Sequence, residues 1–370
     1  MIVRRRKGSA GRAAFRWSLP ARWRALAPPE AHASAGGCFR NNSVPRSSQM
    51  RNFRSNPAQR RDHYQELTDK ILAALEAGIA PWRRPWDPNP CGGSTTPVNA
   101  ATGHRYRGVN LFVLGMSSLA LVSNDPRWCS YRQAAARGWQ VRKGERATPV
   151  YFYKPIEIGD KTTDGGSETR RIPMLRTFSV FHASQIDGVP ALEPTTATKT
   201  VPERVKDVEL IIEASGVPVR IGGERAFYSP SLDVIQMPPD EAFHGPEERA
   251  VVVLHELAHA SGHPTRLNRD LSGRFGSVLY AKEEVRAELT SVAVGSMIGL
   301  PCDIPNHASY LDTWIAVLKQ DRREIFHAMA EAQRMADYIL GFHPDYAETP
   351  SESSDAEGEG ATSIAPLLAA

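Results

Sequence analysis

VVVLHELAHASGH, residues 251–263, decides the fold of the second half of this 370-residue chain. An apolar run leads into His255 and His259, which are four positions apart and therefore lie on one face of a helix, one turn apart. Two imidazoles at this spacing can bind one metal ion, and Glu256 stands beside them, within reach of a water on that metal. We therefore expect a helix over 245–263 that carries a metal site.

The expected cofactor is one divalent metal, Zn²⁺, with Mn²⁺ as the alternative. A metal lowers the pKa of its water toward ~7, and Glu256 as general base would take the proton while the water attacks a carbonyl. The alternative is a core helix with surface histidines and no metal, which would have the same sequence pattern. The metal site is favoured because strand-like segments precede the helix and a second acid-bearing helix follows it.

The third metal ligand has two candidate sources. In the pattern H-E-x-x-H-x-x-G-x-x-H a third histidine follows a glycine turn, and Gly262 is in place, but Thr265 stands where the histidine belongs. The next predicted helix offers Glu284 and Glu288 on one face, with Glu283 about 100° around. We take Glu284 as the ligand and Glu288 as the carboxylate that accepts a hydrogen bond from a ligand histidine; the reverse order remains open.

Cations and aromatic residues interleave along the first half of the chain. Rings that stack on unpaired bases and cations that follow phosphates are what a single strand of nucleic acid needs. The opposite interpretation places these rings in the core, but the proline-rich stretch PWRRPW (81–86) favours an exposed contact. The residues expected to bind single-stranded DNA are Trp82, Arg83, Arg84, Trp86, Arg105, Tyr106, Arg107, Arg142 and Lys143.

Hydrophobic periodicity and turn residues predict an α+β protein of two domains with disordered tails. The expected parts are a basic segment at 1–56, a first domain at 57–190, a linker at 191–203, a second domain at 204–345 and an acidic tail at 346–370. Residues 1–60 hold thirteen Lys and Arg against one acid. Met50 is an alternative start for this chain, which would leave residues 1–49 untranslated.

Composition narrows the class of protein further. Four cysteines without a C-x-x-C pair argue against a disulfide scaffold and against a cysteine zinc site. The longest apolar runs are too short to span a bilayer, and the N-terminus has no proper apolar segment of a secretory signal. We therefore expect a cytoplasmic protein that has no membrane partner.

Several ordered motifs resemble a known family. HYQELTDKILAALEAGIAPWRRPW, NAATGHRYRGVN, GWQVRKGERATPVYFYK and FSVFHASQI are similar to the N-terminal domain of ArdC-type antirestriction proteins, a domain also found in TraC-type primases. YSPSLDVIQMP, HELAHASGH and YAKEEVRAEL resemble the zincin-like metallopeptidase domain that follows it. The resemblance covers roughly 57–342.

This resemblance implies a single-stranded DNA-binding domain joined to a gluzincin-type peptidase domain. It also implies that the protein protects incoming DNA from restriction. It supports His255, Glu256, His259 and Glu284 as the metal site. A protein substrate, such as a component of a restriction system, is the expected second partner. The alternatives are a non-catalytic DNA-binding or restriction-blocking protein with a structural metal, and a plasmid primase accessory protein. Glu256 and an open fourth position on the metal favour catalysis, because structural zinc is usually closed by four protein ligands.

Overall fold

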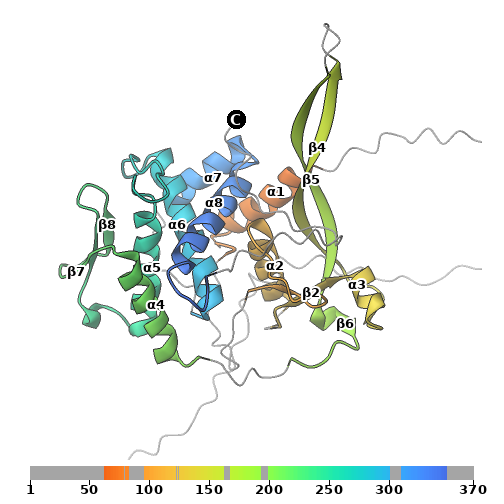
Figure 1. Ribbon diagram of the computed structural model, residues 1–370, viewed down its shortest axis with the longest axis horizontal. Coiled ribbons are helices and arrows are strands. Elements are labelled where there is room, and N and C mark those ends of the chain that lie inside the picture. The colour runs from red at the N-terminus through yellow and green to blue at the C-terminus, as the bar shows by residue number, and fades with distance from the viewer. Residues whose placement is uncertain are drawn as a thin grey trace, which may run out of the picture. The chain divides into compact units, whose positions relative to one another are not determined.

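The computed structural model describes residues 62–78, 80–82, 96–121, 123, 125–161, 167–192, 199–300 and 310–347. All of these residues belong to one unit, Ser55–Ala370. Helices and strands mix in both halves, so the predicted α+β class is confirmed (Figure 1). The basic segment expected at 1–56 lies outside the described residues, and so does the expected acidic tail from residue 348 onward.

The first half combines three helices with a four-stranded sheet in the order β1-β2-β5-β4 and a small pair, β3-β6. Its elements are α1 (His63–Glu76), β1 (Val98–Asn99), α2 (Val109–Ala120), β2 (Arg127–Ser130), α3 (Tyr131–Ala136), β3 (Gln140–Val141), β4 (Thr148–Lys161), β5 (Ser167–His182), the 3-10 turn η2 (Ala183–Gln185) and β6 (Ile186–Asp187). Helix α1 begins where Asp62 caps the backbone N–H of Gln65, and it buries the face that carries Ile71 and Leu75.

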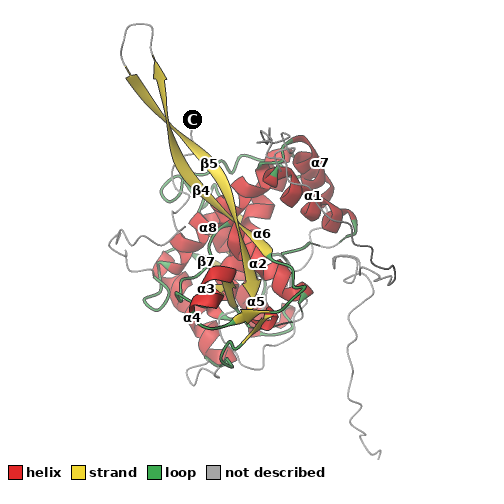
Figure 2. Cartoon of the chain, turned by 90° about the vertical axis from the view of Figure 1, so that its right-hand side faces the viewer, coloured by secondary structure: helices red, strands yellow, loops and turns green. Residues whose placement is uncertain are grey.

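Strands β4 and β5 form a long antiparallel ribbon (Figure 1). Figure 2 shows the same ribbon, in yellow, running out from the helices. Pairing continues to the far end of the ribbon, from Gly159 with Thr169 to Lys161 with Ser167, although the sequence there is polar. This is possible because ladder hydrogen bonds are made by the backbone and need no apolar side chain.

The second half holds a three-stranded sheet, in the order β7-β9-β8, and a group of helices. Its elements are α4 (Val201–Ser215), β7 (Val219–Ile221), β8 (Phe227–Ser229), β9 (Val234–Met237), the 3-10 turn η3 (Asp240–Ala242), α5 (Pro246–Ala260), α6 (Val278–Ile298), α7 (Leu311–Gln320) and α8 (Glu324–Leu340). Helix α6 packs on both α5 and α8. This arrangement places the predicted metal-binding helix directly against the predicted acid-bearing helix.

One hydrophobic core runs through both halves. It includes Ile71 of α1 and Phe112 of α2 together with Ile235 of β9 and Trp314 of α7. Polar contacts cross the same boundary: the Thr68 hydroxyl donates to the carbonyl of Arg322 over 2.8 Å, and the backbone N–H of Gly108 donates to the Gln333 side chain over 2.8 Å. The two sequence domains are therefore two parts of one packed unit.

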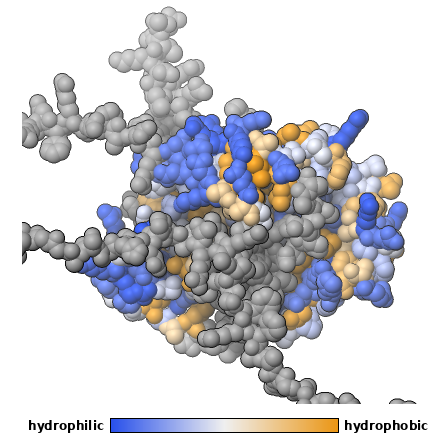
Figure 3. All heavy atoms as spheres, turned by 180° about the vertical axis from the view of Figure 1, so that it is seen from behind, coloured by the Kyte–Doolittle hydropathy of each residue, from blue (hydrophilic) through white to orange (hydrophobic). Residues whose placement is uncertain are grey.

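In Figure 3, the visible hydrophobic side chains of the described residues form separate patches among hydrophilic ones. Among the described residues, no helix combines the length and the apolar character that crossing a membrane requires.

Candidate metal centre

Helix α5 is built to hold polar side chains in a buried position. Pro246 occupies its first turn, where the missing N–H costs nothing, and Glu247 and Glu248 complement the helix dipole there. The apolar residues that follow are buried against β8, β9, α4 and α6. Because this face is anchored in the core, His255 and Glu256 are each only 7% exposed.

Two imidazoles and one carboxylate converge beside α5. The Nε2 atoms of His255 and His259 are 3.1 Å apart. The Glu284 carboxylate of α6 places its Oε2 3.7 Å from Nε2 of His255 and its Oε1 3.7 Å from Nε2 of His259. Among the described residues, these three form a cluster whose potential ligand atoms all lie within 4.8 Å of one another. The side chains are thus arranged around one common point, as metal ligands require.

The charged groups of this cluster shift one another's pKa values. Burial alone would lower the pKa of His259, but the hydrogen bond with Glu283 and the charges of Glu284, Glu283 and Glu256 raise this pKa to about 9. Burial would raise the pKa of Glu284, but the hydrogen bond with His255 and the charges of both histidines lower it to about 2. Glu284 is therefore ionised, and a cation bound by this cluster would have to displace a proton from His259.

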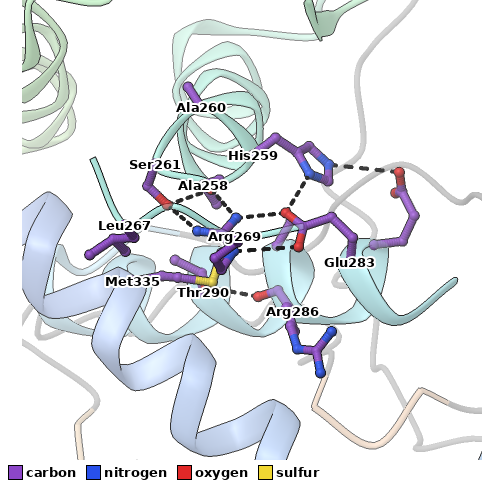
Figure 4. Close-up of polar contacts among 12 residues, drawn as sticks. Ala258, His259, Ala260, Ser261, Leu267, Arg269, Glu283, Arg286, Thr290 and Met335 are labelled. Atoms are coloured by element: carbon purple, nitrogen blue, oxygen red, sulfur yellow. Dashed lines mark hydrogen bonds and ion pairs between the residues drawn. The ribbon is translucent and has the colours of Figure 1, made fainter. Parts of the chain in front are cut away.

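Glu283 holds the far side of the His259 ring. The Nδ1 of His259 donates to the Glu283 carboxylate over 3.2 Å (Figure 4). Its Nε2 faces His255 and Glu284. Glu283 is itself held by Arg269, whose Nη2 donates to the same oxygen over 2.6 Å. This chain of contacts fixes the tautomer and the orientation of the ring, which is the role of an outer carboxylate in metal sites.

This role was expected of Glu288, but Glu283 has the contact with the His259 ring. Glu288 is 1% exposed and accepts a hydrogen bond from the hydroxyl of Tyr310. Among the described residues, Nδ1 of His255 has no hydrogen-bond partner and Nδ1 of His259 is bound to Glu283. The prediction failed because it assumed that only the face shared by Glu284 and Glu288 points toward α5.

A turn after α5 supports Glu283 from the other side. Arg269 also donates to the Ser261 hydroxyl over 2.7 Å and to the carbonyl of Ala258 over 2.9 Å (Figure 4). Gly262 allows the close approach, because a Cβ there would lie 2.9–3.1 Å from side-chain atoms of Leu271 and Arg269. Gly262, the glycine of the pattern H-E-x-x-H-x-x-G, thus leaves space for Arg269, which orients Glu283.

Tyr280 is a site residue that sequence reasoning missed. It lies one turn before Glu284 on α6, and its hydroxyl forms a hydrogen bond with the Glu284 carboxylate. The charge of Glu256 also acts on Tyr280, so the three side chains are neighbours. The spacing of four between Tyr280 and Glu284 was the available signal, since residues one turn apart share a helix face.

The loop after α5 forms an ion pair and hydrogen bonds with the β8–β9 hairpin. The guanidinium of Arg266 binds both carboxylate oxygens of Asp233, and the Tyr228 hydroxyl donates to Asp233 over 2.7 Å. His263 lies 3.9 Å from the same carboxylate and belongs to this group, outside the cluster of potential ligands.

The predicted DNA-binding residues are found in different surroundings. Trp82 is 3% exposed and Tyr106 is 9% exposed, so the stacking role expected of these two rings does not fit their burial. Both rings were expected at the surface because the sequence does not show what covers a loop. Arg83, Arg84 and Trp86 lie outside the described residues.

The remaining predicted cations are nearer the surface. Arg105, Arg142 and Lys143 are exposed, and half-buried Arg107 forms an ion pair with Asp337 over 2.6 Å. Arg142 is engaged with Glu145 at 2.9 Å. These positions are compatible with contacts to phosphates but do not by themselves define a DNA site.

Comparison with known proteins assigns both halves of the chain. Residues 61–181 match the family described as the N-terminal domain of the anti-restriction factor ArdC. Residues 206–331 match the family described as zincin-like metallopeptidase.

Two relatives illustrate the range of this similarity. DNA primase TraC of Escherichia coli is 39% identical over 315 residues, which are 81% of this chain and 29% of TraC, so the chain spans less than a third of that primase. The uncharacterized protein y4eC of Sinorhizobium fredii is 39% identical over 285 residues, which are 75% of this chain and 91% of y4eC.

Solved structures of the antirestriction protein ArdC from plasmid R388 share the fold. The metal-free structure is 34% identical, covers 78% of this chain and all of that one, and has a TM-score of 0.66. The Mn(II)-bound structure of the same protein is 34% identical, with a TM-score of 0.62 and coverage of 77% of this chain and all of that one. This chain therefore belongs to the ArdC family of antirestriction proteins and carries its zincin-like metallopeptidase domain.

Proposed function

We propose that the second half of this protein is a metal-dependent peptidase. The observation that carries the proposal is the convergence of His255, His259 and Glu284 in a buried site, with Glu256 next to the first histidine. Two imidazoles and one carboxylate suit Zn²⁺ and also Mn²⁺, and a Mn(II)-bound form of ArdC from R388 supports a divalent cation. The substrate is a protein, and a component of a restriction system is the class that the family name favours.

The residues of the site divide the chemistry among them. His255, His259 and Glu284 would hold the cation, which supplies a Lewis acid and acidifies water toward a pKa of about 7. Glu256 accepts the proton of the attacking water at its carboxylate and returns it to the leaving amine. Three protein ligands leave a position open for water and substrate, whereas a structural zinc usually has four.

We also propose that the first half binds single-stranded DNA, with antirestriction as the shared purpose of both halves. The match to the ArdC N-terminal domain and the similarity to a DNA primase support this. Exposed Arg105, Arg142 and Lys143 supply cations for phosphates. A non-catalytic DNA-binding or restriction-blocking protein, or a primase accessory protein, would share these features without proteolysis.

Glu256→Gln tests the peptidase mechanism. The variant keeps the shape of the side chain and all three ligands, so it should bind Mn²⁺ or Zn²⁺ like the wild type. Its rate of cleavage of an unfolded protein such as casein, measured with and without single-stranded DNA, should fall about 10²- to 10⁴-fold, because a general base contributes that factor. The control is Glu248→Gln, an acid in the first turn of the same helix. Equal cleavage by Glu256→Gln and the wild type would refute the mechanism.

DNA binding is tested separately. The full chain is titrated into fluorescent single-stranded and duplex oligonucleotides of equal length at two salt concentrations. Tighter binding of the single strand that weakens with salt is the expected result. Equal or absent binding would overturn the role proposed for the first half.

A further inference from the structure

A surface cavity of about 540 Å³ lies in the first half, where α3, β3 and β6 meet the end of β5. Its lining includes Tyr131, Val141, Lys143 and Phe181. Val141 is buried and Phe181 packs on the same small core, so these two side chains form an apolar floor. A volume of this size falls within the range of small-molecule sites, and it exceeds what one nucleobase needs.

Tyr131 supplies an exposed ring to this cavity. It is 55% exposed, among the highest fractions of any large hydrophobic side chain in the described residues. Its backbone is held firmly because it follows Ser130, whose hydroxyl accepts from the N–H of Gln133 while the Gln133 side chain accepts from the N–H of Ser130. Because the backbone that carries it is fixed, the exposed ring is positioned at the cavity as a platform on which a base can stack.

The charges at the rim favour an anion. Lys143 and Arg142 stand side by side at the turn after β3. The Arg142 guanidinium is held by Glu145 at 2.9 Å and by Asp187 at 3.3 Å, which balances its charge. Among the described residues, Lys143 has no such carboxylate partner, so its ammonium group is available to a phosphate.

We infer that this cavity binds one nucleotide of single-stranded DNA, with the base stacked on Tyr131 above the floor of Val141 and Phe181 and the phosphate at Lys143. The inference rests on the proposed DNA binding and gives it a location. A paired base cannot enter, because both of its faces are already covered by neighbouring base pairs in the duplex. The site therefore accounts for a preference for single strands, and it tolerates any base because every base has a stacking face.

The test uses the full chain and a fluorescent oligothymidylate. Tyr131→Ala should raise the dissociation constant about 5- to 150-fold, the loss of one base–aromatic stack, while Tyr131→Phe should stay within about twofold of the wild type. Lys143→Ala should reduce the slope of log K against log salt by about 0.7, one phosphate contact on a single strand. The matched controls are Phe227→Ala and Lys206→Ala, which remove an exposed ring and an exposed cation from the second half.

The outcomes separate this inference from the proposed function. If the wild type does not bind single strands, the proposed DNA binding itself fails. If the wild type binds but Tyr131→Ala behaves like Phe227→Ala, the cavity is not the site although DNA binding stands. An equal loss on duplex DNA would also overturn base stacking. Photocrosslinking with an oligonucleotide that carries 5-iodouracil should map to Tyr131, and crosslinks found only elsewhere would contradict the inference.

Discussion

Replacing Glu283 by glutamine tests how the His259 ring is positioned, because it leaves all three proposed metal ligands in place. Glu283 accepts from Nδ1 of His259 over 3.2 Å and from Arg269 over 2.6 Å. Glutamine keeps the shape and one acceptor oxygen but loses the negative charge. Both donors contact the same oxygen, so the remaining amide oxygen can still accept from both, but the His259 ring and the Arg269 guanidinium lose their negatively charged acceptor.

The expected magnitude follows from this geometry. Loss of an outer carboxylate of a metal site typically lowers metal affinity 10- to 100-fold, which corresponds to about 1.4–2.7 kcal/mol. The protein should also lose stability without metal, because the Arg269 side chain is only 6% exposed and its charge would be left without its carboxylate. Breaking a buried ion pair costs about 3–5 kcal/mol when one charge is left unpaired; glutamine should cost less because it keeps a hydrogen bond.

The assay is competition between the protein and a fluorescent chelator for Mn²⁺ and Zn²⁺, with circular dichroism to confirm the fold. Glu288→Gln is the control, since Glu288 is also a buried carboxylate of the same helix but binds Tyr310 instead. Glu283→Gln should weaken binding of both metals by the stated factor, and Glu288→Gln should change it less than threefold. A larger loss in Glu288→Gln than in Glu283→Gln would refute this assignment of the two glutamates.

Three further changes test other parts of the structure. Gly262→Ala should weaken metal binding severalfold, because a Cβ would lie 3.0–3.1 Å from the Arg269 guanidinium that orients Glu283; unchanged affinity would contradict this route. Trp314→Ala, at a fully buried core position, should lower the free energy of unfolding by about 3–5 kcal/mol in urea, and a loss below 1 kcal/mol would show that the shared core is not formed there. The hydrogen bond from Arg266 lowers the pKa of Asp233, so it stabilises the folded state above the unfolded pKa of about 3.9 and that contribution is lost as pH falls through the lower folded pKa. Urea unfolding should therefore show Arg266→Gln less stable than the wild type at pH 7, with a gap that narrows toward pH 3; a gap that widens would contradict the assignment.

The sequence predicts the second half of this protein well for a physical reason. Helix periodicity and the spacing of His255 and His259 are local properties, and so is the glutamate spacing on α6. The side of α6 that carries Glu283 could not be assigned, because it depends on how α6 crosses α5. A helix buried on nearly all sides, as α6 is, has no single apolar stripe to reveal that crossing.

The first half shows where the residues alone are insufficient. Burial of Trp82 depends on α1 and on segments distant in sequence, so composition could not distinguish a stacking ring from a core ring. Tyr131 is one of the rings interleaved with cations in the first half, but the sequence does not distinguish it from the other rings. Only its place beside Val141 and Lys143, which the fold provides, makes it a candidate contact.

The central claim is a single metal held by His255, His259 and Glu284, and anomalous diffraction from crystals grown with Mn²⁺ or Zn²⁺ tests it most directly. One anomalous peak should lie within about 2.0–2.2 Å of both Nε2 atoms and of a Glu284 oxygen, with Glu256 outside the ligand set. A peak bound through Glu288, a peak that includes Glu256 as a ligand, or no peak between the two histidines would contradict the account.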